Sequence, residues 1–229
     1  MKSREEMIEY LKMGTSDKEF ELTHSFLEEV VPLKVDNETL SSEDIREFSI
    51  RRLLGSGTLG KANETENWNI ANQFVYQKIA QKKPVSVESI KELNNILNPK
   101  DHGYFRTCFS FGAENRYVRP EDINFFIDHF KEFLEQEKKE NILWFSFMIY
   151  LWGTTIHPFS DGNGRTFRLC SDWVLLANNY LPLNYSSTVD ARAAIARNVE
   201  FPKRSNSYAS FLAAIKNSYL FLHQKSQNI

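Results

Sequence analysis

Apolar residues recur along most of this chain at the spacing of amphipathic helices. Clear stripes of this kind run through 65–80, 86–97 and 208–224, and another follows Pro120. Because side chains three or four residues apart share one face of a helix, each stripe predicts a helix that buries this face. The stripe after Pro120 consists of Ile123, Phe126, Ile127, Phe130 and Leu134. The pattern predicts an all-α fold.

Serine residues mark the expected starts of three shorter helices near the N-terminus. The stretches 3–6 and 16–19 each begin with serine and end with glutamate. This is the spacing of a capping box, in which both side chains bond backbone N–H groups at the start of a helix. A third helix is expected to begin at Ser41 or Ser42 and to end near Gly55.

One segment follows the two-residue period of a β-strand instead. In this segment Phe105, Thr107, Phe109 and Phe111 alternate with Arg106, Cys108 and Ser110. Residues 112–115 favour a turn, and 116–118 provide a return strand. We therefore expect one small β-hairpin on an otherwise helical domain.

The polar stretch 157–168 carries most of the candidate chemistry. It lies between an apolar run, 141–156, and an amphipathic helical run, 166–180. We therefore expect a loop that leads into the N-terminus of a helix. The unpaired N–H groups and the partial positive charge at such a terminus attract anions.

The side chains of this stretch suit the chemistry of a nucleotide. The glycines on both sides of Asn163 let the backbone approach a ligand closely. Arg165 and Arg168 are three residues apart, so they share a helix face and can hold one polyphosphate. Asp161 supplies an oxygen ligand suited to Mg²⁺ beside phosphate. His157 titrates near neutrality and can accept a proton from a hydroxyl.

The stretch resembles the signature of the Fic family, His-x-Phe-x-Asp/Glu-Gly-Asn-Gly-Arg-x-x-Arg. Every fixed position is filled, by His157, Phe159, Asp161, Gly162, Asn163, Gly164, Arg165 and Arg168. A weaker resemblance extends over about 84–180. It implies the Fic fold, a helical bundle with a small β-hairpin flap over the active-site loop. We expect an N-terminal helical extension, 1–83, and a catalytic core with C-terminal helices, 84–229.

The resemblance also implies an activity, because members of this family transfer a nucleotide monophosphate, usually AMP from ATP, to a protein hydroxyl. In such a protein adenylyltransferase His157 would deprotonate a Ser, Thr or Tyr hydroxyl, and Asp161 would hold Mg²⁺. The phosphates of ATP would be bound by Gly162, Asn163, Gly164, Arg165 and Arg168. The target would dock as an added strand on the flap. The flap residues expected to receive it are Phe109, Ser110, Phe111 and Gly112.

Many Fic proteins carry an inhibitory helix with the pattern Ser/Thr-x-x-x-Glu-Gly/Asn, whose glutamate pairs with the second arginine of the signature. Here Glu66, followed by asparagine in the helical run 65–80, matches the second half of the pattern. Ala62 stands where the hydroxyl is expected. The resemblance thus implies that Glu66 pairs with Arg168 and inhibits the enzyme, with nearby Glu64 as the alternative.

Other functions stay open at this point. One is a Fic enzyme that uses another nucleotide donor or removes AMP, and another is a Fic-like module that only binds. The intact His157 and Asp161 argue against the binding module. The glycine-rich segment 54–62 contains G-x-G-x-x-G, but it follows a charged, helical run rather than a buried strand. It is therefore expected to be a connector and not a nucleotide loop.

Composition is that of an ordinary globular protein. The chain has 229 residues, 41% hydrophobic and 25% charged, with a net charge of -2. This charge gives no bulk attraction to nucleic acid or to an anionic membrane.

Cys108 and Cys170 have apolar neighbours and are expected to be reduced and buried. We expect the protein to fold in the cytoplasm, and later export stays open. Its expected partner is a protein substrate, and a homodimer is possible.

No membrane segment is expected from the sequence. The longest apolar run, 142–156, is too short to span a bilayer. The first residues are charged and lack the apolar region of a signal peptide.

Overall fold

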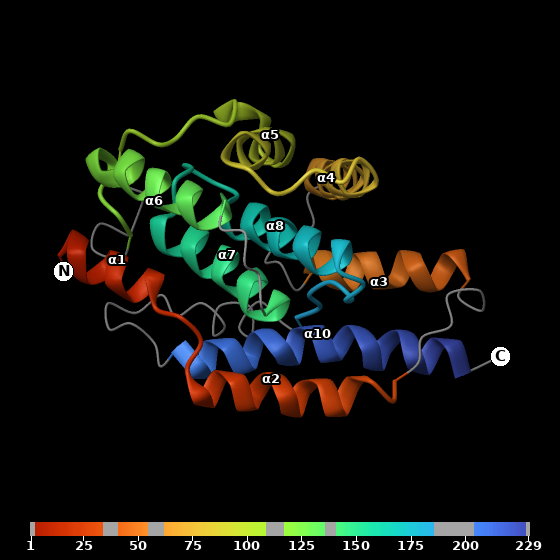
Figure 1. The fold of residues 1–229 in the computed structure, drawn as a ribbon. Helices are drawn as coiled ribbons and strands as arrows, with labels where there is room; N and C mark the ends of the chain where they lie inside the picture. Colours follow the sequence, from red (N-terminus) through yellow and green to blue (C-terminus); the bar gives the residue numbers. More distant parts are fainter. Residues whose placement is uncertain are drawn as a thin grey trace.

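The computed structural model describes residues 3–33, 41–54, 62–108, 117–135, 141–185 and 204–227. These residues form helices joined by turns and loops, and no strand occurs within the described ranges. The α-helices in Figure 1 are α1 (Arg4–Lys12), α2 (Asp17–Val30), α3 (Ser42–Leu54), α4 (Ala62–Ala80), α5 (Val87–Leu97), α6 (Ile123–Glu135), α7 (Ile142–Ile156), α8 (Asn163–Ala177) and α10 (Arg204–Gln227). There are also two short 3₁₀ helices in the described residues. η1 (Pro99–Asp101) follows α5, and η2 (Pro120–Asp122) directly precedes α6.

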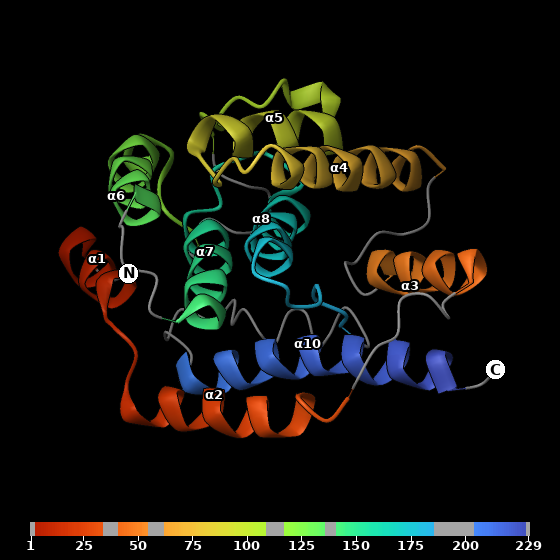
Figure 2. The ribbon, with the colours of Figure 1, turned by 45° about the vertical axis from the view of Figure 1, so that its right-hand side comes forward.

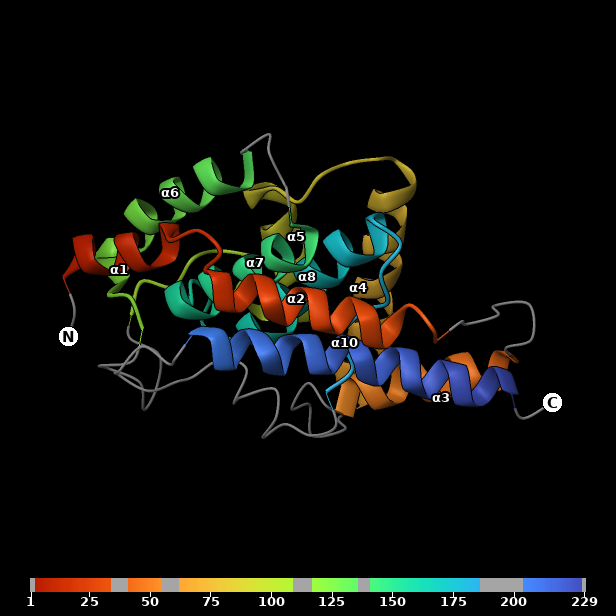
Figure 3. The same ribbon diagram turned by 60° about the horizontal axis from the view of Figure 1, so that its bottom comes forward.

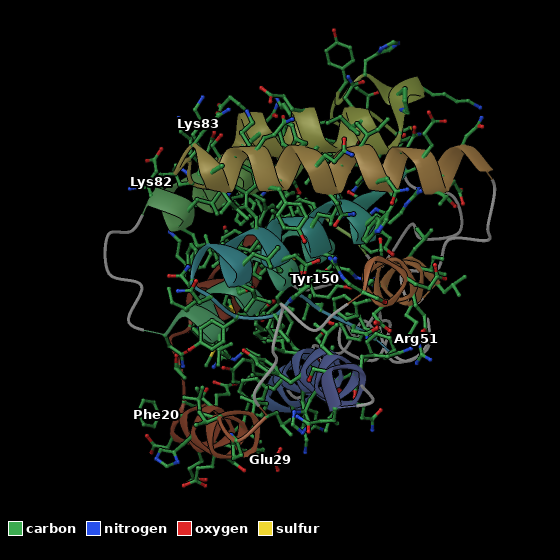
Figure 4. All side chains as sticks on the ribbon, turned by 90° about the vertical axis from the view of Figure 1, so that its right-hand side faces the viewer. Phe20, Glu29, Arg51, Lys82, Lys83 and Tyr150 are labelled. Atoms are coloured by element: carbon green, nitrogen blue, oxygen red, sulfur yellow. The ribbon has the colours of Figure 1, made fainter. Side chains whose placement is uncertain are left out.

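The pair α7 and α8 forms the centre of the molecule (Figure 1, Figure 2). α7 is buried along nearly its whole length, as expected for a helix that is apolar on all sides. α4 and α5 cover α8, and α6 lies against α7. On the opposite side α10 packs against α7, α2 and α3, and Figure 3 shows α2 and α10 side by side. Figure 4 places Tyr150 of α7 in the interior and Phe20 on the outer helix α2.

Gly153 determines how closely α7 and α8 approach. A Cβ atom at this position would lie 2.0 Å from the ring of Phe167 on α8. The ring therefore lies directly on the backbone of α7, in space that no side chain at 153 could share. Phe167 also neighbours Phe159 of the signature loop, with ring centroids 6.4 Å apart. Through this buried contact Phe159 anchors the loop in the core.

The predicted helix starts near the N-terminus are confirmed. Ser3 and Ser16 each cap their helix in a complete capping box. α3 also matches its predicted range. The last helix is longer than the predicted 208–224, because α10 begins at Arg204. Arg204 donates to both carboxylate oxygens of buried Glu19 at 2.9 Å, an anchor that apolar periodicity does not reveal.

The β-hairpin stays a prediction. The described parts of its two arms, 105–108 and 117–118, are not strands. The expected docking residues Phe109, Ser110, Phe111 and Gly112 lie outside the described residues, as does most of the glycine-rich segment, 55–61.

The two cysteines differ in exposure. Cys170 is buried in α8 as predicted, but Cys108 is exposed, so the prediction of two buried thiols is wrong. Cys108 contacts the interior through its backbone, whose oxygen accepts from Nη1 of buried Arg106 at 3.0 Å, and not through its side chain. Both thiols are free.

The predicted division at residue 83 falls between α4 and α5. Helices on both sides of it share one core, since α4 packs against α5 and α8, and α2 packs against α10. The indole of Trp152 in α7 donates to the backbone oxygen of Leu11 in α1 at 3.1 Å. The division into an extension and a catalytic core stays a prediction. Among the described helices, none is both long enough and apolar enough to cross a bilayer.

Candidate active site

The stretch 157–168 forms the turn between α7 and α8 and the first turns of α8. His157 caps α7 in the left-handed conformation, with φ 51° and ψ 57°, and its N–H donates to the oxygen of Gly153 at 2.9 Å. Gly162 caps the start of α8, also left-handed, with φ 77°. Glycine adopts this conformation without strain. These two caps bring the end of α7 back to the N-terminus of α8.

Asn163, the first residue of α8, ties this turn together. Its Oδ1 accepts from the backbone N–H of Phe159 at 2.9 Å, and its Nδ2 donates to the backbone oxygen of Phe159 at 2.8 Å. Nδ2 also lies 3.1 Å from Nδ1 of His157. Because the amide is buried and both of its ends are bound, Asn163 fixes the orientation of the imidazole.

A second side-chain amide, that of Asn94 on α5, also binds this turn. Its Nδ2 donates to the backbone oxygen of Asp161 at 3.0 Å and to Oγ1 of Thr166 at 3.1 Å. Asn94 is fully buried. Asn94 could not be predicted as a site residue, because nothing in the spacing of α5 relates it to a loop 67 residues away.

Asp161 and Arg165 face each other at the surface of the turn. Nη2 of Arg165 lies 3.4 Å from Oδ2 of Asp161, whose side chain is 72% exposed. Oδ1 of Asp161 accepts from the N–H of Gly162 at 2.6 Å. The described residues contain no cluster of three or more metal-binding side chains. A single exposed carboxylate nevertheless fits Mg²⁺, which usually binds one or two carboxylates and completes its shell with water and substrate phosphate.

Arg168 lies in the interior of the molecule. It is 1% exposed, and its Nη1 donates to the backbone oxygen of Arg52 at 3.1 Å. Its guanidinium lies over the ring of Tyr185, 4.9 Å from the centroid. Arg52 belongs to the last turn of α3, where carbonyl groups carry a partial negative charge. The structure thus brings His157 together with Asn163 and Arg165 together with Asp161, and it places Arg168 against the end of α3.

Helix α4 brings Glu64 toward the site. Oε1 of Glu64 lies 4.0 Å from Nη1 of Arg165, whereas Glu66 is exposed. Among the ion pairs of the described residues, none joins Glu66 to Arg168. Glu64, the alternative that the sequence left open, is therefore the glutamate of α4 that lies near Arg165, and the inhibitory role of Glu66 stays a prediction.

Comparison with known proteins agrees with this architecture. Residues 84–175 match the model of the Fic/DOC family. The chain contains a Fic domain. This Fic domain spans α5 to α8 and includes the whole signature.

Among the relatives of the chain are proteins named protein adenylyltransferase Fic. That of Drosophila grimshawi is 23% identical over 156 residues, 65% of this chain and 32% of the relative. That of Drosophila persimilis is 24% identical over 156 residues, 65% of this chain and 31% of the relative. The chain therefore spans about a third of the length of these relatives.

Solved structures show the same fold. A Fic domain containing signaling protein from Bacteroides thetaiotaomicron gives a TM-score of 0.67 at 16% identity, covering 90% of this chain and 98% of that one. IbpAFic2, solved in complex with adenylylated Cdc42, gives a TM-score of 0.65 at 19% identity, covering 91% of this chain and 72% of that one. The helical arrangement of this chain is that of Fic proteins.

Proposed function

We propose that this protein transfers AMP from ATP to a Ser, Thr or Tyr hydroxyl of a target protein. The observation that carries the proposal is the contact of His157 with Asn163 at the N-terminus of α8, since an imidazole next to a helix end that can attract phosphate suits this transfer. The names of the relatives, and the adenylylated Cdc42 bound to one structural neighbour, support the same chemistry.

The start of α8 supplies the phosphate site. The first N–H groups of a helix have no intrahelical partner, and the helix dipole adds a partial positive charge there. A Cβ atom at Gly164 would meet nothing within 4 Å, so the surface at this point is open to a ligand. Arg165, beside this terminus, contributes a guanidinium that can bind two phosphate oxygens. Gly162, Asn163, Gly164 and Arg165 together form the proposed cradle for the α- and β-phosphates.

His157 is the proposed general base. It would take the proton of the target hydroxyl as the oxygen attacks the α-phosphate and pyrophosphate leaves. The contact with Asn163 orients its ring before the reaction. Because an amide nitrogen only donates, Nδ1 accepts in this contact and Nε2 carries the proton of the neutral ring, so the base becomes active when Asn163 releases Nδ1. The residues predicted to dock the target, 109–112, would align the hydroxyl by adding a strand of the target to the flap.

Asp161 is the proposed ligand for Mg²⁺. A bound Mg²⁺ would neutralise charge on the phosphates of ATP. Asp161 is suited to this by its exposure and by its position next to Gly162 of the cradle.

We further propose that the conformation described is self-inhibited. Arg168, the residue expected to grip the γ-phosphate, is enclosed beneath α3 and Tyr185. Glu64 lies near Arg165 and competes with phosphate for its positive charge. Productive binding of ATP would require Arg168 to leave the backbone oxygen of Arg52.

The position of a radioactive label in the donor tests the proposed reaction. Purified protein is incubated with Mg²⁺ and with ATP labelled at either the α- or the γ-phosphate, alone and with candidate target proteins. Transfer of AMP predicts protein-bound label from the α-position only. Label from the γ-position would contradict the proposal. Parallel reactions with α-labelled GTP, UTP and CTP would show whether another base is preferred, and an Asp161→Asn variant is expected to need more Mg²⁺.

A further inference from the structure

Arg106 joins the end of α7 to two separate loop segments. It is only 6% exposed. Its Nε donates to the backbone oxygen of His157 at 2.7 Å. Nη1 donates to the oxygen of Cys108 at 3.0 Å, and Nη2 donates to the oxygen of Val118. Its own backbone N–H donates to the oxygen of Pro158 at 2.8 Å.

These contacts make specific use of arginine. The last carbonyl groups of a helix such as α7 have no intrahelical partner and carry a partial negative charge. A guanidinium offers five N–H donors in a rigid planar fork and can bond several carbonyl groups at once, whereas lysine places a point charge on a flexible stem. Burial lowers the pKa of the Arg106 guanidinium from its ordinary value, so the carbonyl contacts must offset a cost of desolvation.

Tyr117 covers one face of the His157 ring. The two ring centroids are 3.8 Å apart, and the ring planes differ by 14°. Tyr117 directly precedes Val118, whose oxygen Arg106 binds. The same guanidinium therefore fixes the main chain on both sides of the stack. With Asn163 at Nδ1, the imidazole is held at its face, its edge and its backbone.

We propose that Arg106 and Tyr117 are positioning residues for His157, a role that rests on the function proposed above. Arg106 locks the main chain of His157 to that of Val118, and the ring of Tyr117 then restricts rotation of the imidazole. The held ring presents its base to the target hydroxyl in one orientation, as proton transfer at hydrogen-bond distance requires. Neither residue exchanges a proton in the reaction.

The first test follows the ring of His157 by NMR and needs no activity. The chain has five histidines, so the His157 signal is the one lost in His157→Ala. The stack predicts that the ring-current shift of the His157 carbon-bound protons disappears in Tyr117→Leu, persists in Tyr117→Phe and changes in Arg106→Lys. An unchanged His157 signal in both Tyr117→Leu and Arg106→Lys would overturn the proposal.

The second test measures AMP transfer. Arg106→Lys and Tyr117→Leu are expected to lower kcat by about 10–100-fold with little change in KM for ATP, because small displacements of a catalytic group cost rates of this order. Tyr117→Phe should restore the kcat of the parent. A Tyr117→Phe variant as slow as Tyr117→Leu, or a loss confined to KM for ATP, would show that the stack does not position the base.

Arg204 provides a matched control for the loss of a buried guanidinium. It binds Glu19 and the backbone oxygens of Met13 and Gly14 at the start of α10. Figure 1 and Figure 2 place α10 on the side of α7 and α8 opposite α5. Arg204→Lys should lower stability but leave the His157 signal and kcat unchanged. If Arg204→Lys reduces kcat as much as Arg106→Lys, the effect is general destabilisation and the proposal fails.

The two proposals fail separately. If the parent protein and Glu64→Ala transfer no nucleotide to any protein, the proposed function is wrong. The NMR comparison of Tyr117→Leu, Tyr117→Phe and Arg106→Lys then decides by itself whether these residues hold the ring of His157.

Discussion

The guanidinium of Arg168 donates a hydrogen bond to the backbone oxygen of Arg52, 3.1 Å away, in the last turn of α3. Arg52 in turn pairs with buried Asp172, one helical turn beyond Arg168, at 2.6 Å. The second arginine of the Fic signature is thereby built into the contact between α3 and α8. In the proposed inhibition, exposure of Arg168 to ATP would require this end of α3 to move.

Loosening α3 should therefore increase the affinity for ATP. Phe48 holds α3 against α10 by stacking on Phe221, with centroids 5.7 Å apart, and the guanidinium of Arg52 lies over its ring. Phe48→Ala is expected to tighten ATP binding by about tenfold or more, which corresponds to about 1.4 kcal/mol. Calorimetric titration with ATP measures this. Phe20→Ala, on the exposed face of α2, is the control. Unchanged affinity in a Phe48→Ala variant whose α3 amides exchange faster would rule out inhibition by α3.

The two glutamates of α4 can be separated by substitution. Glu64 lies 4.0 Å from Arg165, whereas Glu66 is exposed. Glu64→Ala is expected to raise the rate of self-labelling by several-fold, because the variant lacks the carboxylate that competes with phosphate for Arg165. Glu66→Ala should have a smaller effect. The rates are compared at one ATP concentration, and a larger gain from Glu66→Ala would return the inhibitory role to Glu66, as the sequence pattern implies.

Gly153 should tolerate no side chain. A Cβ atom there would overlap the ring of Phe167 at 2.0 Å, so Gly153→Ala must displace a buried aromatic ring. Overpacking of this kind typically costs about 1–3 kcal/mol. Urea unfolding measures the loss. Gly164→Ala is the matched control, since its Cβ would meet nothing within 4 Å, and it should change the free energy of unfolding little. Equal stability of the two variants would mean that α7 and α8 can separate at low cost.

Stability should depend on pH through Glu19. Burial raises the pKa of this carboxyl, but hydrogen bonds from Arg204 and Ser16 outweigh burial and hold the pKa below its ordinary value. Glu19 therefore makes its full contribution to the free energy of unfolding above the pKa that it has in the unfolded chain, about 4.3. This contribution is lost as the pH falls through the lower pKa of the folded state. The stability advantage of the parent over Glu19→Gln should shrink from pH 7 toward pH 3. An advantage that stays constant over this range would show that the carboxylate charge is not involved.

Local patterns in the sequence predicted most of the helical fold. The capping boxes at Ser3 and Ser16 and the apolar stripe after Pro120 involve residues within one or two turns of each other, so their structural meaning can be read without the tertiary fold. The loop between α7 and α8 followed from the same logic, since an apolar run and an amphipathic run flank a segment with two glycines.

Contacts between distant segments could not be predicted in this way. Asn94 reaches the signature loop from α5, and Arg168 meets the end of α3, because of how the helices pack and not because of any local spacing. The exposure of Cys108 was missed for a related reason. Its apolar neighbours in the sequence suggested a buried thiol, whereas in the structure its backbone oxygen binds buried Arg106 and its side chain is exposed.

The intact mass of the protein after incubation with ATP and Mg²⁺ tests the role of His157 most directly. The parent and Glu64→Ala should gain the mass of AMP, whereas His157→Ala should gain it at least about 10²–10⁴-fold more slowly, as expected for loss of a general base. Calorimetry should show the same affinity for ATP in the parent and in His157→Ala, since the base acts on the target hydroxyl. Modification of His157→Ala at the rate of the parent would contradict the account.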